Sequence, residues 1–257
     1  MSRHALRFVF LVGWLALTVA ADARTLTVLA AASLREGFKD MAHAFEAKHP
    51  GDHVRISFAG SQQLAASILL DAPADVFASA DVAQMTRVVS AGKAAKPSIL
   101  CSNRLVIAVN KLAVLRVRKL ADLGKPGVIV VLAKLLVPAG AYTEKLFARL
   151  PSAEVAAINA NVRSRESDVR TVLARVALGE ADAGIVYATD IDASQDHVVS
   201  VPIGLDVQTP VAYMISALSG SSERSLAAEF VKLTLSPRGQ AILHAHGFLP
   251  PPARHRL

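Results

Sequence analysis

Short apolar runs alternate with longer segments of helical spacing along the chain, and this alternation is typical of an α/β fold. Residues 25–30 (Thr-Leu-Thr-Val-Leu-Ala) form the first β-branched, apolar run and predict a strand. Apolar residues then recur at helical spacing, at Phe38, Met41, Ala42 and Phe45. Ser33 and Glu36, which precede them, fit the S-x-x-E capping box that begins many helices. The sequence therefore predicts a strand, a turn at Ser33 and a helix with one buried face.

A second strand-to-helix turn follows within residues 54–63. Residues 54–58 (Val-Arg-Ile-Ser-Phe) predict a strand, and Ala59-Gly60-Ser61 predicts a tight turn into a helix. If the two strands are parallel neighbours, both turns lie at the carboxyl edge of one sheet, where open α/β sheets bind ligands. Each serine alone is more simply a helix cap, but a hydroxyl beside the N–H groups of a helix N-terminus also attracts anions. Ser33 and Ser61 together therefore predict an anion-binding site.

The alternation of strands and helices continues through most of the remaining chain. Further strands are predicted at residues 73–79, 105–109, 128–132 and 183–187. Helices are predicted at residues 81–92, after Val137-Pro138-Ala139-Gly140, and at residues 168–178, with Asp168 as N-cap and Gly179 as the stop. The polar and basic residues 110–119 are expected to cross from one lobe to another. Tyr187 ends a strand at the same sheet edge as the serines, although a buried tyrosine with a satisfied hydroxyl is the plainer interpretation.

The N-terminal residues 1–23 have the pattern of an export signal. Arg3 and Arg7 precede an apolar run over residues 8–20, and Ala21-Asp22-Ala23 fits a signal-peptidase site. The run is shorter than the roughly 20 residues that a membrane-spanning helix needs. No cysteine follows it directly, which disfavours a lipoprotein. Cleavage near Ala23 is expected to release a soluble periplasmic protein.

Composition narrows the classes of function. With 53% hydrophobic residues, the 257-residue chain can bury a large core, in one large domain or two small ones. The formal net charge is +7, but the lysines and arginines are scattered and only 5% of residues are aromatic, so nucleic acid is not an expected partner. Cys101 is the only cysteine, which excludes an internal disulfide and a thiolate metal cluster. We expect it to be a small buried hydrophobic residue.

Six short motifs together resemble the periplasmic molybdate-binding proteins of ABC importers, which are type II solute-binding proteins. The motifs are Ala31-Ala32-Ser33-Leu34, Phe58-Ala59-Gly60-Ser61, Pro73-Ala74-Asp75-Val76-Phe77-Ala78-Ser79-Ala80, Val137-Pro138-Ala139-Gly140, Gly179-Glu180-Ala181-Asp182-Ala183-Gly184-Ile185-Val186-Tyr187 and Leu235-Ser236-Pro237-Arg238-Gly239-Gln240-Ala241-Ile242-Leu243. They occur in the family's order and span residues 25–248, nearly the whole mature chain. The set is specific, whereas the last motif alone would mark only the wider class of solute-binding proteins.

The resemblance implies a type II periplasmic-binding-protein fold, in which two α/β lobes joined by two crossovers close on a ligand. The first lobe would contain residues 24–108 and the returning residues 205–257, which include the C-terminal tail, and the second lobe residues 109–204. The resemblance further implies that two serines, two backbone N–H groups and a tyrosine hydroxyl hold a tetrahedral oxyanion. These roles fall on Ser33, Ser61, Ala139, Val169 and Tyr187.

The function that the resemblance implies is the capture of molybdate, and also of tungstate, for the membrane permease of an ABC importer. We expect a monomer that is not an enzyme, that needs no cofactor, and that binds molybdenum only as the oxyanion through the same residues. One alternative is a binding protein for sulfate, phosphate or an organic acid on the same fold. The other is an exported serine hydrolase, although neither serine lies in a G-x-S-x-G motif.

Two features depart from the simple family pattern or leave a choice open. Lys134-Leu135-Leu136 stands where the family usually has a polar turn before the Pro-Ala-Gly segment, which bears on the contact from Ala139. Asp168 precedes Val169 and has two possible orientations. As an N-cap it points at its own helix, and turned inward it would repel a dianion or coordinate the metal centre.

Overall fold

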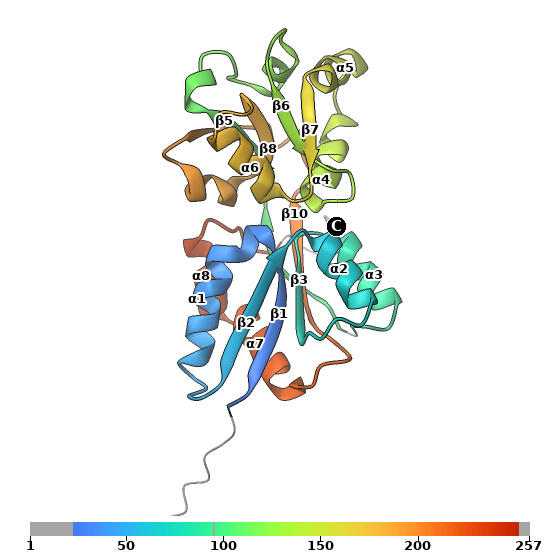
Figure 1. The fold of residues 1–257 in the computed structure, drawn as a ribbon, viewed down its shortest axis with the longest axis vertical. Coiled ribbons are helices and arrows are strands. Elements are labelled where there is room, and N and C mark those ends of the chain that lie inside the picture. Colours follow the sequence, from blue (N-terminus) through green and yellow to red (C-terminus); the bar gives the residue numbers. More distant parts are fainter. Residues whose placement is uncertain (1–22, 95, 252–257) are drawn as a thin grey trace, which may run out of the picture.

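The chain folds into two lobes, one above the other in Figure 1, and each lobe is built around a mixed β-sheet. This computed structural model describes residues 23–94 and 96–251. The expected export signal at residues 1–23 therefore lies outside the described residues, except for Ala23. Within the described ranges, no helix combines the length and the apolar character needed to cross a membrane.

The sheet of the first lobe has the strand order β2-β1-β3-β10-β4. Its strands are β1 (Thr25–Ala31), β2 (His53–Ala59), β3 (Val76–Ser79), β4 (Ser98–Asn103) and β10 (Val211–Ala217). β1 runs parallel to both β2 and β3, and β10 runs antiparallel to β3 and β4. The strands before Ser33 and Ser61 are parallel neighbours, so the condition for a shared sheet edge is met.

The sheet of the second lobe has the strand order β7-β6-β8-β5-β9. Its strands are β5 (Leu105–Asn110), β6 (Val130–Ala133), β7 (Val162–Glu166), β8 (Ala183–Tyr187) and β9 (Val198–Pro202). β6 is parallel to β7 and β8, and β5 is antiparallel to β8 and β9. The two sheets thus share one plan, in which one strand runs antiparallel to the other strands of its sheet.

Helices cover both sheets. The first lobe contains α1 (Arg35–Glu46), α2 (Ser61–Leu69), α3 (Val82–Ser90), α7 (Arg224–Leu235) and α8 (Pro237–Ala245), and the second lobe α4 (Pro138–Phe147), α5 (Ser152–Ala160) and α6 (Val169–Ala177). Short 3₁₀ helices are η1 (Ala32–Leu34), η2 (Lys111–Ala113), η3 (Leu120–Gly124) and η4 (Ala188–Ser194). In Figure 1, α1 and α8 lie on one side of the first sheet, and α2 and α3 on the other.

The chain crosses between the lobes twice, and the first crossing differs from the expected one. β4 pairs in the first sheet and β5 in the second, so the crossing takes place at Arg104, which separates them. The prediction of a crossover at residues 110–119 was wrong, because this stretch begins at Asn110, the last residue of β5, which is already paired in the second sheet. The expected division after Ala108 falls inside β5, all of whose residues are buried. The second crossing lies between β9 and β10.

The helix predicted after the first strand is present, but it begins differently. Its apolar residues Phe38, Met41 and Phe45 are buried, and the Phe45 ring packs edge-on against Phe230 of α7 at 5.4 Å between centroids. The capping-box prediction was wrong, because Ser33 lies inside η1 and its side chain makes no cap hydrogen bond there. The buried face of α1 therefore follows from the hydrophobic pattern, whereas its first turn is shaped by contacts distant in sequence.

Candidate functional site: a pocket between the lobes

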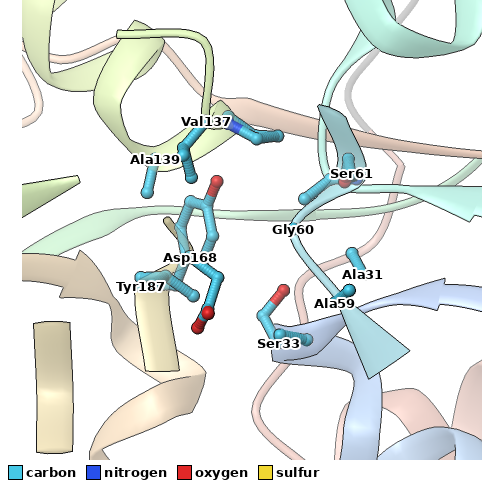
Figure 2. Close-up of a pocket in the computed structure, with 13 residues that line it drawn as sticks. Ala31, Ser33, Ala59, Gly60, Ser61, Val137, Ala139, Asp168 and Tyr187 are labelled. Carbon is cyan, nitrogen blue, oxygen red and sulfur yellow. Dashed lines mark hydrogen bonds between the residues drawn. The ribbon is translucent and has the colours of Figure 1, made fainter. Parts of the chain in front are cut away.

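A small pocket lies between the two lobes, and Figure 2 shows the side chains around it. Its walls include Ala31, Ser33, Ala59, Gly60, Ser61, Val137, Ala139, Asp168, Val169 and Tyr187. The space among them is small, about 210 Å³ even when the part open to solvent is counted. The structure thus brings together every residue that the sequence proposed for the oxyanion, and the pocket suits a small ion.

The first lobe contributes two serines from adjacent strand-to-helix turns. The parallel register pairs Ala31 of β1 with Ala59 of β2, so the chain leaves both strands at the same sheet edge. Ser33 follows β1 within η1, Ser61 is the first residue of α2, and both side chains are buried. The Ser61 Oγ accepts a hydrogen bond from the Ala80 N–H at 3.0 Å. The Ser61 proton therefore remains available to a ligand in the pocket.

The second lobe contributes the N-terminus of α4. Pro138 occupies the first helical position, where its fixed φ suits a helix start, and Ala139 follows it at the pocket wall. A Cβ added to Gly140 would lie 2.0 Å from the Lys134 carbonyl oxygen, so only glycine allows this close approach of the chain. Leu136, in the segment that departs from the family pattern, is exposed, and Ala139 still reaches the pocket.

The N-terminus of α6 lies on the same wall, and it settles the orientation of Asp168. The Asp168 carboxylate caps its own helix, because it accepts hydrogen bonds from the N–H and the Oγ1 of Thr171, both at 2.9 Å. Val169 is the first residue of α6 and lines the pocket. The first N–H groups of a helix have no acceptor within it, so they are free for an anion.

Tyr187 completes the second-lobe side of the pocket from the end of β8. Its side chain is 1% exposed, and within the described part of the chain its hydroxyl has no hydrogen-bond partner. Figure 2 shows that the phenol points toward Val137 and Ala139. Burial raises the pKa of Tyr187 well above its usual value, so the hydroxyl stays protonated and can donate. A buried hydroxyl without a partner at a pocket wall is suited to a ligand oxygen.

No cationic side chain lies on the described wall of the pocket. Arg170 follows Val169, but its guanidinium forms two ion pairs. The Arg170 Nε lies 3.0 Å from the Asp190 Oδ1, and the second partner is Glu36 of the first lobe. Burial raises the pKa of Asp190 to about 7, although Arg170 acts to lower it. The guanidinium charge is therefore compensated locally, and hydroxyls and helix N-termini are the groups on this wall that suit an anion.

Polar contacts between the lobes show that the two lobes are closed around the pocket in this structure. The Gln62 Nε2 donates to the Ser167 carbonyl oxygen at 2.7 Å, and the Glu36–Arg170 ion pair spans the same gap. Gln84 Nε2 lies 3.4 Å from the Leu136 carbonyl oxygen. Both walls of the pocket are thus held together by side chains from one lobe and groups of the other.

One buried residue beside the pocket was missed by sequence reasoning. The hydroxyl of Tyr213 on β10 lies 2.9 Å from the Ser33 Oγ. Tyr213 sits in the run Val-Ala-Tyr-Met-Ile-Ser-Ala, which is apolar almost throughout and is buried at all but its last residue. A strand of this kind gives no alternation that would show which residues face a ligand site. The only signal was the tyrosine itself, since buried tyrosines usually hydrogen-bond.

The two lobes and the pocket of hydroxyls and helix N-termini between them define a two-lobed solute-binding protein. The chain belongs to the bacterial extracellular solute-binding proteins, whose family profile matches residues 26–249. Among its relatives, the molybdate-binding protein ModA of Mycobacterium tuberculosis is 36% identical over 230 residues, which cover 89% of this chain and 86% of the relative.

Solved structures confirm the fold that the motifs implied. The periplasmic molybdate-binding protein of Azotobacter vinelandii superposes with a TM-score of 0.74 at 21% identity, covering 88% of this chain and 100% of that one. The sulfate-binding protein SubI of Mycobacterium tuberculosis gives a TM-score of 0.79 at 20% identity, covering 88% and 87% of the two chains. These likenesses concern the fold, and the choice of anion depends on the pocket.

Proposed function

We propose that this protein is an exported receptor that binds molybdate, and also tungstate, between its lobes and delivers it to the permease of an ABC importer. This proposal rests on one observation: two serine hydroxyls, the hydroxyl of Tyr187, which is unpaired among the described residues, and the N-termini of α4 and α6 all lie around one small pocket. The 36% identity to a molybdate-binding relative supports this anion. In this proposal the protein acts as a monomer without a cofactor, and residues 1–23 direct its export to the periplasm.

The donors of the pocket suit a fully deprotonated dianion. Ser61 and Tyr187 each have a hydroxyl proton to donate, and the first N–H groups of α4 and α6 cannot accept. Asp168 is the one carboxylate on the described wall, and its two oxygens cap α6 by accepting from Thr171. Hydrogen phosphate carries a proton that needs an acceptor, so it is disfavoured relative to molybdate.

Sulfate is the second candidate, because it is also a tetrahedral dianion and the fold is shared with a sulfate-binding protein. Donor chemistry alone does not separate sulfate from molybdate, so the fit of the larger anion must decide. Organic acids are disfavoured because they need more space than this small pocket gives. The serine-hydrolase alternative is disfavoured too, because among the described residues neither Ser33 nor Ser61 hydrogen-bonds a histidine.

Calorimetric titration of the mature protein, from Arg24 onward, tests the proposal with molybdate, tungstate, sulfate and phosphate as separate ligands. We expect tight binding of molybdate and tungstate and weak or no binding of the other two. Ser33→Ala removes one predicted donor and should weaken molybdate binding by about 10-fold or more, since a hydrogen bond to a charged group contributes about 1.5–3 kcal/mol. Ser57→Ala, an exposed serine on β2, is the matched control and should bind as the wild type does. Preferential sulfate binding, or no oxyanion binding, would overturn the proposal.

A further inference from the structure

Tyr213 connects the predicted anion-binding groups of both lobes from behind the pocket. Its side chain is completely buried on β10, and its hydroxyl lies 2.9 Å from the Ser33 Oγ. Its ring packs edge-on against Tyr187 of the second lobe, with 5.8 Å between centroids, and against Phe248 at 5.4 Å. Tyr213 does not line the pocket itself. Any influence on the ligand must therefore act through Ser33 or Tyr187.

The direction of the Tyr213–Ser33 hydrogen bond follows from the burial of the Tyr213 hydroxyl. The Tyr213 side chain is completely buried, and burial raises the pKa of Tyr213 well above its usual value, so the hydroxyl keeps its proton. A buried O–H that finds no acceptor is costly, so this proton must be donated to a neighbouring oxygen.

The Tyr213 proton has one acceptor among the described residues, the Ser33 Oγ at 2.9 Å. A serine hydroxyl that accepts from Tyr213 still has its own proton, and that proton is directed into the pocket. If the tyrosine hydroxyl is absent, Ser33 can turn its proton away and present lone pairs to the pocket instead. The Tyr213 hydroxyl thus decides whether Ser33 presents its proton or its lone pairs to the pocket.

We propose that Tyr213 is a positioning residue that makes Ser33 an obligatory hydrogen-bond donor, and so favours a fully deprotonated anion over one that carries a proton. This inference rests on the proposed function, because it assumes that Ser33 contacts a bound oxyanion. It predicts that Tyr213 acts through the Ser33 hydroxyl and contributes little to binding when that hydroxyl is missing.

A double-mutant cycle with Tyr213→Phe and Ser33→Ala tests the inference, with molybdate and phosphate as the probes. The phenylalanine keeps the ring contacts with Tyr187 and Phe248 and removes only the hydroxyl. In the wild-type background we expect Tyr213→Phe to weaken molybdate binding by about 5- to 10-fold, and in the Ser33→Ala background by less than about twofold. The affinity ratio of molybdate to phosphate should also fall by at least about threefold in Tyr213→Phe alone. A merely structural role would give equal losses in both backgrounds and leave this ratio unchanged.

Folding is controlled separately. Thr234→Val removes another fully buried hydroxyl, on α7, and should leave both affinities unchanged. If Tyr213→Phe does not fold, Tyr213→Met replaces it in the cycle, because it also removes the hydroxyl and fills the buried space with a flexible apolar side chain, and the same dependence on Ser33 is expected. Equal losses in both serine backgrounds would overturn this inference while leaving the proposed function intact. A folded wild type that binds no oxyanion would overturn both.

Discussion

The unpaired hydroxyl of Tyr187 gives the sharpest prediction about the pocket. The change is Tyr187→Phe, which keeps the buried ring and removes a hydroxyl that has no hydrogen-bond partner in the described part of the chain. Because this hydroxyl is predicted to donate to a dianion, its loss should cost about 1.5–3 kcal/mol of binding free energy. This corresponds to a dissociation constant for molybdate raised by roughly 10- to 150-fold.

The same change should not destabilise the ligand-free protein. A buried hydroxyl without a partner costs about 1–3 kcal/mol relative to one that is satisfied, and phenylalanine carries no such group. Opening of the lobes would let water relieve part of this cost, so the expected effect on the free energy of unfolding lies between no change and a gain of about 1 kcal/mol. The variant should therefore bind much more weakly while unfolding at the same temperature or a slightly higher one.

Titration calorimetry measures the affinity, and thermal unfolding with and without molybdate measures the stability. Tyr142→Phe is the matched control, because the Tyr142 hydroxyl accepts a hydrogen bond from the Ala212 N–H at 3.1 Å. Its loss leaves a buried N–H unpaired and should lower the free energy of unfolding by about 1–3 kcal/mol. The reasoning fails if Tyr187→Phe binds molybdate as the wild type does, or if it destabilises the ligand-free protein as much as Tyr142→Phe.

Three further predictions concern the frame of the pocket. Gly140→Ala should destabilise the protein by at least about 1–3 kcal/mol in thermal unfolding and weaken molybdate binding, because the new Cβ would lie 2.0 Å from the Lys134 oxygen at the start of α4. Gln62→Ala removes the hydrogen bond to the Ser167 oxygen across the cleft and should raise the dissociation constant by about 2- to 10-fold in calorimetry. The pKa of Asp190 is raised from 3.8 to about 7 in the folded protein, so the folded state binds this proton more tightly than the unfolded state does. The protonated Asp190 therefore stabilises the folded protein in acid, and this stabilisation is lost as pH rises from 3.8 through about 7. Denaturant titrations over this range should show that loss in the wild type and not in Asp190→Asn.

Each of these predictions has a control or an outcome that contradicts it. Gly220→Ala has open space around the added Cβ and should leave stability and binding nearly unchanged. Ser67→Ala, on the same helix as Gln62, loses only a hydrogen bond to its own helix and should not change the affinity. The interpretation of Asp190 is contradicted if wild type and Asp190→Asn show the same dependence of unfolding free energy on pH.

The sequence predicted the layers of the fold because the signals for them are local. The β-branched run before Ser33 and the run before Ser61 each predict a strand, and their parallel pairing brings the two turns together. The residues alone pointed to these two serines and to Tyr187. The backbone positions Ala139 and Val169 came only from the resemblance, because a backbone N–H leaves no trace in the type of its residue.

The errors occurred where distant contacts decide the local structure. Glu36 has the spacing of a capping box, but its carboxylate ion-pairs with Arg170, 134 positions away, and the first turn adopts another form. The crossing at Arg104 is a single residue between two strands, and the polar run Ser102-Asn103-Arg104 is too short to predict a passage from one lobe to the other. Strand pairing in different sheets distinguishes β4 from β5, and pairing is a non-local property.

The pocket also suggests why the proposed anion selectivity would rest on neutral groups. A lysine or arginine on the wall would attract sulfate, phosphate and carboxylates alike, since its charge acts at a distance and in every direction. Hydroxyls and N–H groups act only at short range and along their bonds, so they also reject a ligand whose proton needs an acceptor. The guanidinium of Arg170, which follows the wall residue Val169, is paired with Glu36 and Asp190 and ties the lobes together. Its charge therefore contributes to closure, and recognition is left to donors whose direction the surrounding hydrogen bonds can set.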